Sequence, residues 1–349
     1  MNTTTNPTTN PTTNPTTNPT TNPTTNPTTK QSYYDTLRTL SEASVDQHFQ
    51  AFKDIAWDDP EFHLDPSDER FILTDADEIG RHEWYKSLSK ERQIQVGVYR
   101  YAQIAKVGRQ FEQVLIAGVM HHLILAKDGN PEFRYAMHEV TEETHHIQMF
   151  QESVNRFVEN AGVDGVAGAP GWFAWLAPLV TSAGTWFPEI FFVGILGGEE
   201  PIDHLQKSIM RAGGSHPLID RVMQIHIAEE ARHIGFAHQY LEHHWAQMNP
   251  LKRRALTYLF PVVMRLLCDV IMVPSKQARE DMGIPKDVAK EIWWKSEDSE
   301  KLLRDLFSDV RLLADNLGIR KGPAALVWRV LGIDGRAARF RAQPSSAAV

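Results

Sequence analysis

EETHH at residues 142–146 and EEARH at residues 229–233 are the two stretches of sequence that decide the fold. Each contains a glutamate followed three positions later by a histidine, Glu143 with His146 and Glu230 with His233, and each pair is preceded by a further glutamate. On an α-helix, residues three apart share one face, so each pair can offer a carboxylate oxygen and an imidazole nitrogen to one ion. One such pair arises easily by chance in a chain with 15 histidines, but two copies of the extended pattern predict a metal site.

A further glutamate lies 31 residues before each pair: Glu112 precedes Glu143, and Glu199 precedes Glu230. This spacing fits an antiparallel hairpin of two helices, because a chain that rises about 1.5 Å per residue and then turns back returns to the same height. A two-metal site in a bundle needs one glutamate from each of two further helices, and these residues would supply them. Glu200, which adjoins Glu199 next to a proline, is the alternative ligand at this position.

His226 is the candidate for one more nitrogen ligand, because it shares a helix face with Glu230 and His233 at 100° per residue. The predicted ligand set is Glu112, Glu143, His146, Glu199, His226, Glu230 and His233. Its four carboxylates would balance the charge of two Fe(II) ions, so a buried site would be close to neutral.

Other acidic and histidine residues near the motifs have weaker claims. Glu142 with His145 is a competing frame of the same motif, and the Glu143 frame is preferred because an acidic residue precedes only that one. Candidates either for orienting the ligand imidazoles or for surface positions are Glu142, Glu229, Asp203 and His204. Histidines expected at the surface or at helix ends are His121, His122, His243 and His244.

Apolar residues recur at three- and four-residue intervals from Arg92 onward without an alternating strand pattern, so the fold class is predicted to be all-α. The expected helices are 92–126, 131–161, 171–211, 216–247, 251–272, 285–316 and 323–332. Residues 31–91 are expected to form a cap on the bundle from short helical pieces. The apolar stretch 172–196 is long enough to span a membrane, but prolines interrupt it, and we expect it in the centre of the bundle.

The N-terminal region has a different composition. Residues 6–29 are six consecutive copies of Asn-Pro-Thr-Thr, which contain no charged or large apolar side chain and cannot form a core. The predicted organisation is a disordered tail at 1–30, a single helical-bundle domain at 31–335 and a flexible tail at 336–349. The repeat lacks the cationic start and apolar stretch of a signal peptide, and the chain has one cysteine, Cys268, so we expect a cytoplasmic protein.

Composition and missing motifs exclude several functions. The net charge of −8, from 44 acidic and 36 basic residues, argues against binding of nucleic acid. One cysteine excludes an internal disulfide and a site built from several thiolates. HEVTE at 138–142 begins like a zinc-protease helix but has Glu142 where that motif needs histidine. Since phosphate loops, dinucleotide fingerprints and nucleophile elbows are also missing from the sequence, electrons would have to come from an external donor.

These motifs together resemble the AurF-type p-aminobenzoate N-oxygenase family of non-haem di-iron proteins, over roughly residues 41–326. The resemblance rests on VGRQFE at 107–112, the two acidic-Glu-x-x-His segments, Glu199, and His226 four residues before Glu230. Ferritins, fatty-acyl desaturases and ribonucleotide reductase small subunits resemble one another in carboxylates and Glu-x-x-His pairs, and the N-oxygenases add the third histidine. The repeat tail is not part of the family pattern.

The resemblance implies a ferritin-like helical bundle with additional capping helices, two iron ions that cycle between Fe²⁺ and Fe³⁺, and O₂ as co-substrate. It also implies an amine substrate that is oxidised through a hydroxylamine toward a nitroso or nitro product. Expected partners are a small-molecule amine, an external reductase or other electron donor, and a second copy of the chain in a homodimer, with no nucleic acid and no membrane. The alternatives are a di-iron hydroxylase or desaturase acting at carbon, with the same ligands, and a ferroxidase or iron-binding protein, against which the long cap argues.

Overall fold

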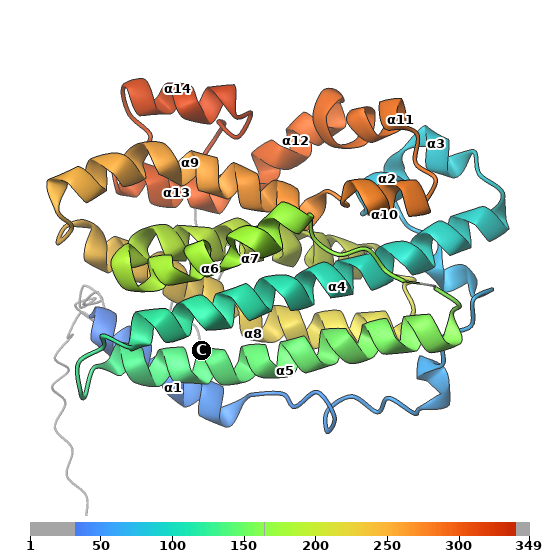
Figure 1. Cartoon of the computed structure of the whole chain (residues 1–349), viewed down its shortest axis with the longest axis horizontal. Coiled ribbons are helices and arrows are strands. Elements are labelled where there is room, and N and C mark those ends of the chain that lie inside the picture. The colour runs from blue at the N-terminus through green and yellow to red at the C-terminus, as the bar shows by residue number, and fades with distance from the viewer. Residues whose placement is uncertain (1–31, 164, 340–349) are drawn as a thin grey trace, which may run out of the picture. The chain divides into compact units, whose positions relative to one another are not determined.

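The computed structural model describes residues 32–163 and 165–339. Most of these residues lie in helices (Figure 1). The all-α prediction is confirmed, because the described residues contain helices and no strand. The predicted tail at 1–30 lies outside the described residues, as do residues 340–349 of the predicted C-terminal tail. The α-helices are α1 Tyr33–Asp46, α2 Glu78–Arg81, α3 Glu83–Lys86, α4 Lys90–Leu123, α5 Pro131–Asn160, α6 Gly171–Trp186, α7 Pro188–Ala212, α8 Pro217–Trp245, α9 Pro250–Met272, α10 Lys276–Asp281, α11 Lys286–Lys290, α12 Glu297–Leu306, α13 Ser308–Asn316 and α14 Pro323–Val330. Two 3₁₀ turns, Pro60–Phe62 and Glu69–Phe71, and a π-helical turn, Glu291–Lys295, complete them.

Four long helices, α4, α5, α7 and α8, form the bundle that holds the predicted ligands. Their starts follow local rules: the Asn130 side chain accepts from the backbone N–H of Glu132 at the start of α5, and proline occupies the first position of α5, α7 and α8. Figure 1 shows α4 and α5 side by side as one hairpin, and α7 packs on α8 as the other. The hairpins predicted from the 31-residue spacings therefore form.

The remaining helices cover this bundle. Helix α1 packs on α5 and α8, α6 packs on α4 and α7, and α9 packs on α7. The close approach of α6 to α4 depends on glycine, because a Cβ at Gly184 would lie 2.1 Å from the carbonyl oxygen of Gly118. The region expected as a cap packs through Phe71, whose ring lies 5.1 Å from the His216 ring and 5.9 Å from the Phe157 ring.

Two expected helices are wrong in extent. Residues 171–211 form two helices, α6 and α7, because Pro188 has no N–H to continue the ladder and the chain bends at Phe187. Residues 285–316 are also divided, since Ser296 caps a new helix, α12, and α13 begins at Ser308.

The apolar stretch that is long enough to span a membrane does not form a single helix. The stretch 172–196 is broken at Phe187, so it is not one continuous span. The expectation that it lies in the centre of the bundle is wrong for α6, where Trp175 is 80% exposed, and holds for residues 191–196 of α7, which are mostly buried. Within the described part of the chain, one segment, Pro250–Asp281, is long and apolar enough to cross a membrane, and half of its apolar window is buried inside the protein. By length and composition alone this is weak support for a membrane protein.

Candidate metal centre

The bundle brings all seven predicted ligands to one place in its interior. Helix α4 carries Glu112, α5 carries Glu143 and His146, α7 carries Glu199, and α8 carries the remaining three residues. None of the seven side chains is more than 1% exposed. Seven ionisable side chains in an apolar interior are costly unless they neutralise one another or bind cations.

Their polar atoms form three overlapping groups, within each of which the ligand atoms lie within 4.8 Å of one another. The groups are Glu112 with His146, His226 and Glu230; Glu143 with Glu230 and His233; and Glu112 with Glu143 and Glu199. Three of the glutamates each belong to two groups, which is the sharing expected of carboxylates placed between two neighbouring ions.

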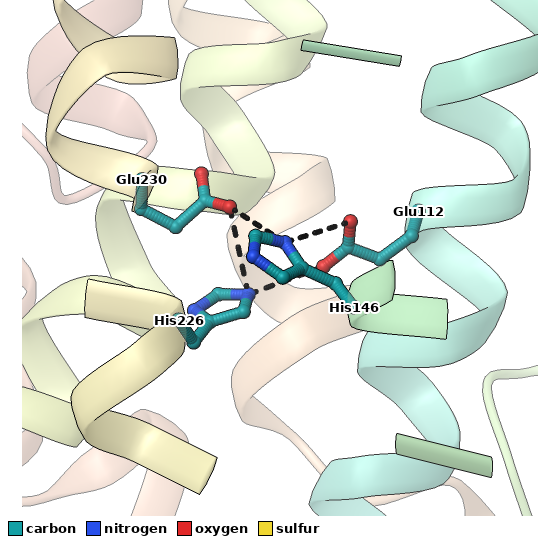
Figure 2. Close-up of side chains that lie close together, drawn as sticks. All are labelled: Glu112, His146, His226 and Glu230. Carbon is teal, nitrogen blue, oxygen red and sulfur yellow. Dashed lines mark hydrogen bonds and ion pairs between the residues drawn. The ribbon is translucent and has the colours of Figure 1, made fainter. Parts of the chain in front are cut away.

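Figure 2 shows the first group, in which two imidazoles and two carboxylates from three helices point toward one another. The His226 Nε2 atom lies 3.2 Å from Glu112 Oε1 and 3.7 Å from Glu230 Oε1. The His146 Nδ1 atom lies 3.3 Å from the same Glu230 oxygen. A cation placed among these atoms would replace hydrogen bonds between ligands with metal–ligand bonds.

Each Glu-x-x-His histidine is held by the acidic residue that precedes the other pair. The His146 Nε2 atom lies 2.8 Å from Glu229 Oε2, and the His233 Nε2 atom lies 2.7 Å from Glu142 Oε2. When the outer nitrogen donates to a carboxylate, the inner Nδ1 atom is left as the lone-pair donor that faces the cluster. Arg232 Nη2 lies 3.0 Å from Glu142 Oε1 and 3.8 Å from Glu229 Oε1, so one cation serves both carboxylates.

His226 has a different outer partner. Its Nδ1 atom lies 2.9 Å from Gln206 Oε1, so the amide oxygen accepts the Nδ1 proton and leaves Nε2 to face the cluster. Gln206 was missed by sequence reasoning. It lies seven residues after Glu199 on α7, two helical turns along the same face, and that spacing was the available signal.

Burial and mutual repulsion control the protonation of this cluster. Burial first, and then the Glu230 and Glu143 carboxylates, raise the pKa of Glu199 well above its usual range. Burial lowers the pKa of His226 to about 4, so His226 is a neutral donor at physiological pH. Burial opposes the charged forms of His146 and His233 too, but the surrounding carboxylates outweigh it and raise both pKa values. Protons on these two rings thus balance carboxylate charge that metal ions would otherwise balance.

The residues present fit a pair of divalent cations. One buried oxygen each of Glu112, Glu199 and Glu230 makes no hydrogen bond within the described part of the chain. A buried carboxylate oxygen without a donor is costly, and metal coordination would satisfy it. Carboxylate oxygen with imidazole nitrogen is a donor set suited to iron, manganese or zinc.

The structure separates the alternatives that the sequence left open. Glu199 lies in the cluster, whereas the neighbouring Glu200 accepts a hydrogen bond from His238 Nε2 at 2.7 Å. His145 lies outside the three groups and is only partly buried, so the Glu143 frame is the one that points inward. Of the candidate orienting residues, Glu142 and Glu229 contact ligand histidines, whereas Asp203 pairs with Lys207 and His204 lines a different cavity. The four other histidines, His121, His122, His243 and His244, lie in the last turns of α4 and α8, as expected.

Glu139 was also missed by sequence reasoning. It lies one turn before Glu143 on α5, is fully buried, and neither of its carboxyl oxygens makes a hydrogen bond within the described residues. Burial raises the pKa of Glu139 to about 8, and the carboxylates of Glu230 and Glu142 act in the same direction. It is therefore a neutral carboxylic acid at pH 7. Glu139 precedes Glu143 by four residues, and this spacing on one helix face was the sequence signal that could have identified it.

Comparison with known proteins shows which family the chain belongs to. A family model described as P-aminobenzoate N-oxygenase AurF matches residues 30–318. An uncharacterized protein of Mycobacterium tuberculosis, Rv0885, is 46% identical over 313 residues, which cover 89% of this chain and 91% of the relative. An uncharacterized protein of Mycobacterium bovis, Mb0909, is similar to the same extent. The resemblance inferred from the motifs is thus confirmed, and the chain belongs to the P-aminobenzoate N-oxygenase AurF family.

Proposed function

We propose that the protein is an O₂-activating, non-haem di-iron oxygenase that oxidises the nitrogen of an arylamine-like substrate through the hydroxylamine to a nitroso or nitro product. Family membership supports the class of reaction. The observation that carries the proposal is the buried cluster of four carboxylates and three imidazoles, with His226 facing Glu112 and Glu230. When bound there, two iron ions would supply the reduction of O₂ and the transfer of oxygen to the amine.

The side chains divide between two positions for the ions. One would be held by Glu112, His146, His226 and Glu230, and the other by Glu143, Glu230 and His233 with Glu199 nearby. His226 would add a nitrogen to the first position, and its neutral state would make it a donor without competition from a proton. The extra electron density favours oxidation of an amine nitrogen over attack on carbon. This is why we rank the N-oxygenase above a carbon hydroxylase or desaturase with the same ligands.

An apolar cavity inside the bundle is the proposed place for the amine. Its lining includes Ala105, Ser153, Gln206 and Ile219, each of which lies seven residues from a ligand on its own helix. Seven residues correspond to about 10 Å along a helix, so the cavity lies two turns from the cluster. Phe150 joins the two, since it lines the cavity and its ring lies 5.1 Å from the His226 ring.

The lining of this cavity contains no charged side chain. A carboxylate on the ring of the substrate, as in p-aminobenzoate, would be buried there without a cation and would be disfavoured by several kcal/mol. We therefore propose that the preferred amine has an uncharged, apolar ring.

A matched pair of variants tests the function. The iron-loaded and chemically reduced protein is exposed to O₂ with aniline, p-toluidine, p-aminobenzoate or an aliphatic amine, and the products are identified by mass spectrometry. His226→Ala should bind less iron or lose amine oxidation, and His204→Ala, on α7 but outside the cluster, should keep both. Carbon-hydroxylated products, or iron oxidation alone, would overturn the proposal in favour of a hydroxylase or a ferroxidase. Full amine oxidation by His226→Ala at unchanged iron content would remove His226 from the mechanism.

We also propose that the protein acts in the cytoplasm as a homodimer supplied with electrons by an external reductase. Exposed apolar side chains on α6 support self-association: Trp175 is 80% exposed and Leu179 is 69% exposed. Light scattering of the purified protein would give the mass directly, and a monomer at micromolar concentration would contradict the homodimer.

A further inference from the structure

A chain of buried aromatic rings runs from the metal cluster in the direction opposite to the apolar cavity. The cavity lies beyond His146 on α5, toward Ser153, whereas Tyr135 precedes Glu143 on the same helix. The rings of Tyr135 and Phe236 have centroids 4.8 Å apart. The contact matters because Tyr135 is fully buried and its hydroxyl makes no hydrogen bond within the described residues.

The chain continues through α7 and α8. Phe236 lies 5.3 Å from Phe192 and 6.1 Å from Tyr240, measured between ring centroids. Phe192 stacks on Tyr240 with centroids 3.8 Å apart, and Tyr240 lies 4.2 Å from the His244 ring. Each successive ring is in van der Waals contact or nearly so, which gives a continuous path of π-systems.

The outer end of the path reaches the surface at the start of α1. His244 lies 6.0 Å from Tyr33, which stacks on His243 at 4.1 Å and lies 5.2 Å from Tyr34. Tyr33 is 9% exposed and Tyr34 is 39% exposed, so solvent and solutes reach this end.

The inner end begins one turn from a ligand. Phe236 follows His233 by three residues on α8, and Tyr135 precedes Glu143 by about 12 Å along α5. Burial raises the pKa of Tyr135, and His233 is the charged side chain with the largest effect on Tyr135. Because Phe236 is one turn from His233 and Tyr135 packs on Phe236, the inner end of the path lies on the side of the cluster that holds His233.

A carboxylate is placed to take protons from the two outer buried tyrosines. Burial and then Glu132 raise the pKa values of Tyr33 and Tyr240, so both phenols are protonated at rest and both lie near the same carboxylate. Glu132 Oε1 accepts from His244 Nε2 at 2.9 Å. Burial raises the pKa of Glu132, but His244, Tyr33 and His122 together outweigh burial and lower it. Glu132 is therefore an ionised base within the ring path.

We propose that this path carries single oxidising equivalents from the metal centre to Tyr240 and Tyr33, and so protects the protein when O₂ has reacted and no amine is bound. One electron passes inward through Phe192 and Phe236, on which Tyr135 packs, to the oxidised centre. The phenol that loses the electron gives its proton to Glu132 and becomes a neutral tyrosyl radical. A small thiol or ascorbate-type reductant at the exposed end returns one hydrogen atom equivalent, as an electron and a proton. The inference rests on the proposed redox-active centre, but it does not depend on the identity of the substrate.

The test follows the radical itself in the whole iron-loaded protein without amine. Reduced protein is mixed with O₂, frozen within milliseconds to seconds, and examined by electron paramagnetic resonance for tyrosyl radical per bound iron. We expect the double variant Tyr33→Phe/Tyr240→Phe to lose the signal at least tenfold, and Glu132→Gln to slow its formation. The control is Tyr101→Phe, a buried tyrosine on α4 at the cavity side of the cluster, which should match the wild type. Peptide mass spectrometry should find oxidation of Tyr33 or Tyr34 after repeated cycles in the wild type.

The outcomes separate the proposed transfer of oxidising equivalents along the aromatic path, called the relay below, from the enzymatic function. A wild-type protein that binds iron and consumes O₂ without a tyrosyl radical overturns the relay, and so does a double variant with as much radical as the Tyr101→Phe control. Protein that binds no iron also overturns it, because the oxidant is then missing. Radical formation without any amine oxidation leaves the relay in place and removes the N-oxygenase proposal, and amine oxidation without radical does the reverse. Iron content and helical circular dichroism, measured on every variant, show whether a lost signal reflects unfolding.

Discussion

Replacement of Glu142 by glutamine tests whether the carboxylates behind the ligand histidines set the affinity for metal. Glu142 Oε2 accepts from His233 Nε2 at 2.7 Å, while Oε1 accepts from Arg232 Nη2 at 3.0 Å. Glutamine has the same shape but only one acceptor oxygen, and its NH₂ group would face either the ring N–H or the guanidinium. One of the two donors must therefore lose its partner.

The magnitude follows from the role of such outer partners. Loss of a carboxylate that orients a ligand histidine typically weakens metal binding by about 10–100-fold. That range corresponds to about 1.4–2.7 kcal/mol of binding free energy. Because Glu142 holds only His233, we expect the ion beside Glu143 and Glu230 to be weakened and the ion beside His226 to be bound nearly as in the wild type.

The assay is an anaerobic titration of metal-free protein with Fe(II) in competition with a chromogenic chelator. Two binding steps should separate in Glu142→Gln and coincide more closely in the wild type. The control is Glu152→Gln on the same helix, where the carboxylate pairs with Arg156 at 2.9 Å away from the cluster. Thermal unfolding of the metal-free variants, followed by circular dichroism, distinguishes weakened binding from a damaged fold.

Unchanged affinity for both ions in Glu142→Gln would refute the reasoning. It would mean that His233 keeps its orientation without the carboxylate, or that it is not a ligand. The related variant Glu229→Gln removes the partner of His146 and should weaken the other ion. A loss confined to the same ion in both variants would contradict the arrangement in which Glu142 holds His233 and Glu229 holds His146.

Three further predictions concern residues of the cluster, a buried acid beside it and the packing of the helices around it. Glu199→Gln should lower the iron bound per protein, and Glu200→Gln should leave it unchanged, since only Glu199 lies in the cluster; equal iron in both variants, measured by atomic emission, would contradict this assignment. Folding favours protonated Glu139, whose pKa is raised to about 8, so wild-type stability falls as pH rises from about 4.3, the unfolded pKa, to about 8. Glu139→Gln should therefore be more stable than the wild type by about 1–3 kcal/mol at pH 8 and equal to it near pH 4, as measured by urea unfolding of the metal-free protein; a constant difference across this range would count against a buried neutral acid. Gly184→Ala should destabilise by about 1–3 kcal/mol through its clash with the backbone of α4, whereas Gly235→Ala, which has open space on α8, should stabilise by about 0.5–1 kcal/mol; thermal melts compare the two, and a stable Gly184→Ala would show that α6 moves freely.

The sequence by itself determined the helical class and the side chains that gather in the cluster. Both depend on short-range periodicity: residues three apart must share a helix face, and equal 31-residue spacings return two helices to one height. The ends of α5 and α8 could also be predicted, because proline and capping side chains act within a few residues. That these seven side chains bind iron remains a prediction from the motifs and the family.

Only the tertiary structure decided which groups meet across helices. The choice of Glu199 over Glu200, the crossed pairs of His146 with Glu229 and His233 with Glu142, and the contact of Gln206 with His226 depend on how helices rotate against one another. Rotation is fixed by packing of the whole core, and a helical period of 3.6 residues leaves neighbouring positions such as 199 and 200 on faces about 100° apart. The aromatic path to Tyr33 likewise arises from contacts between segments distant in sequence, which local periodicity does not encode.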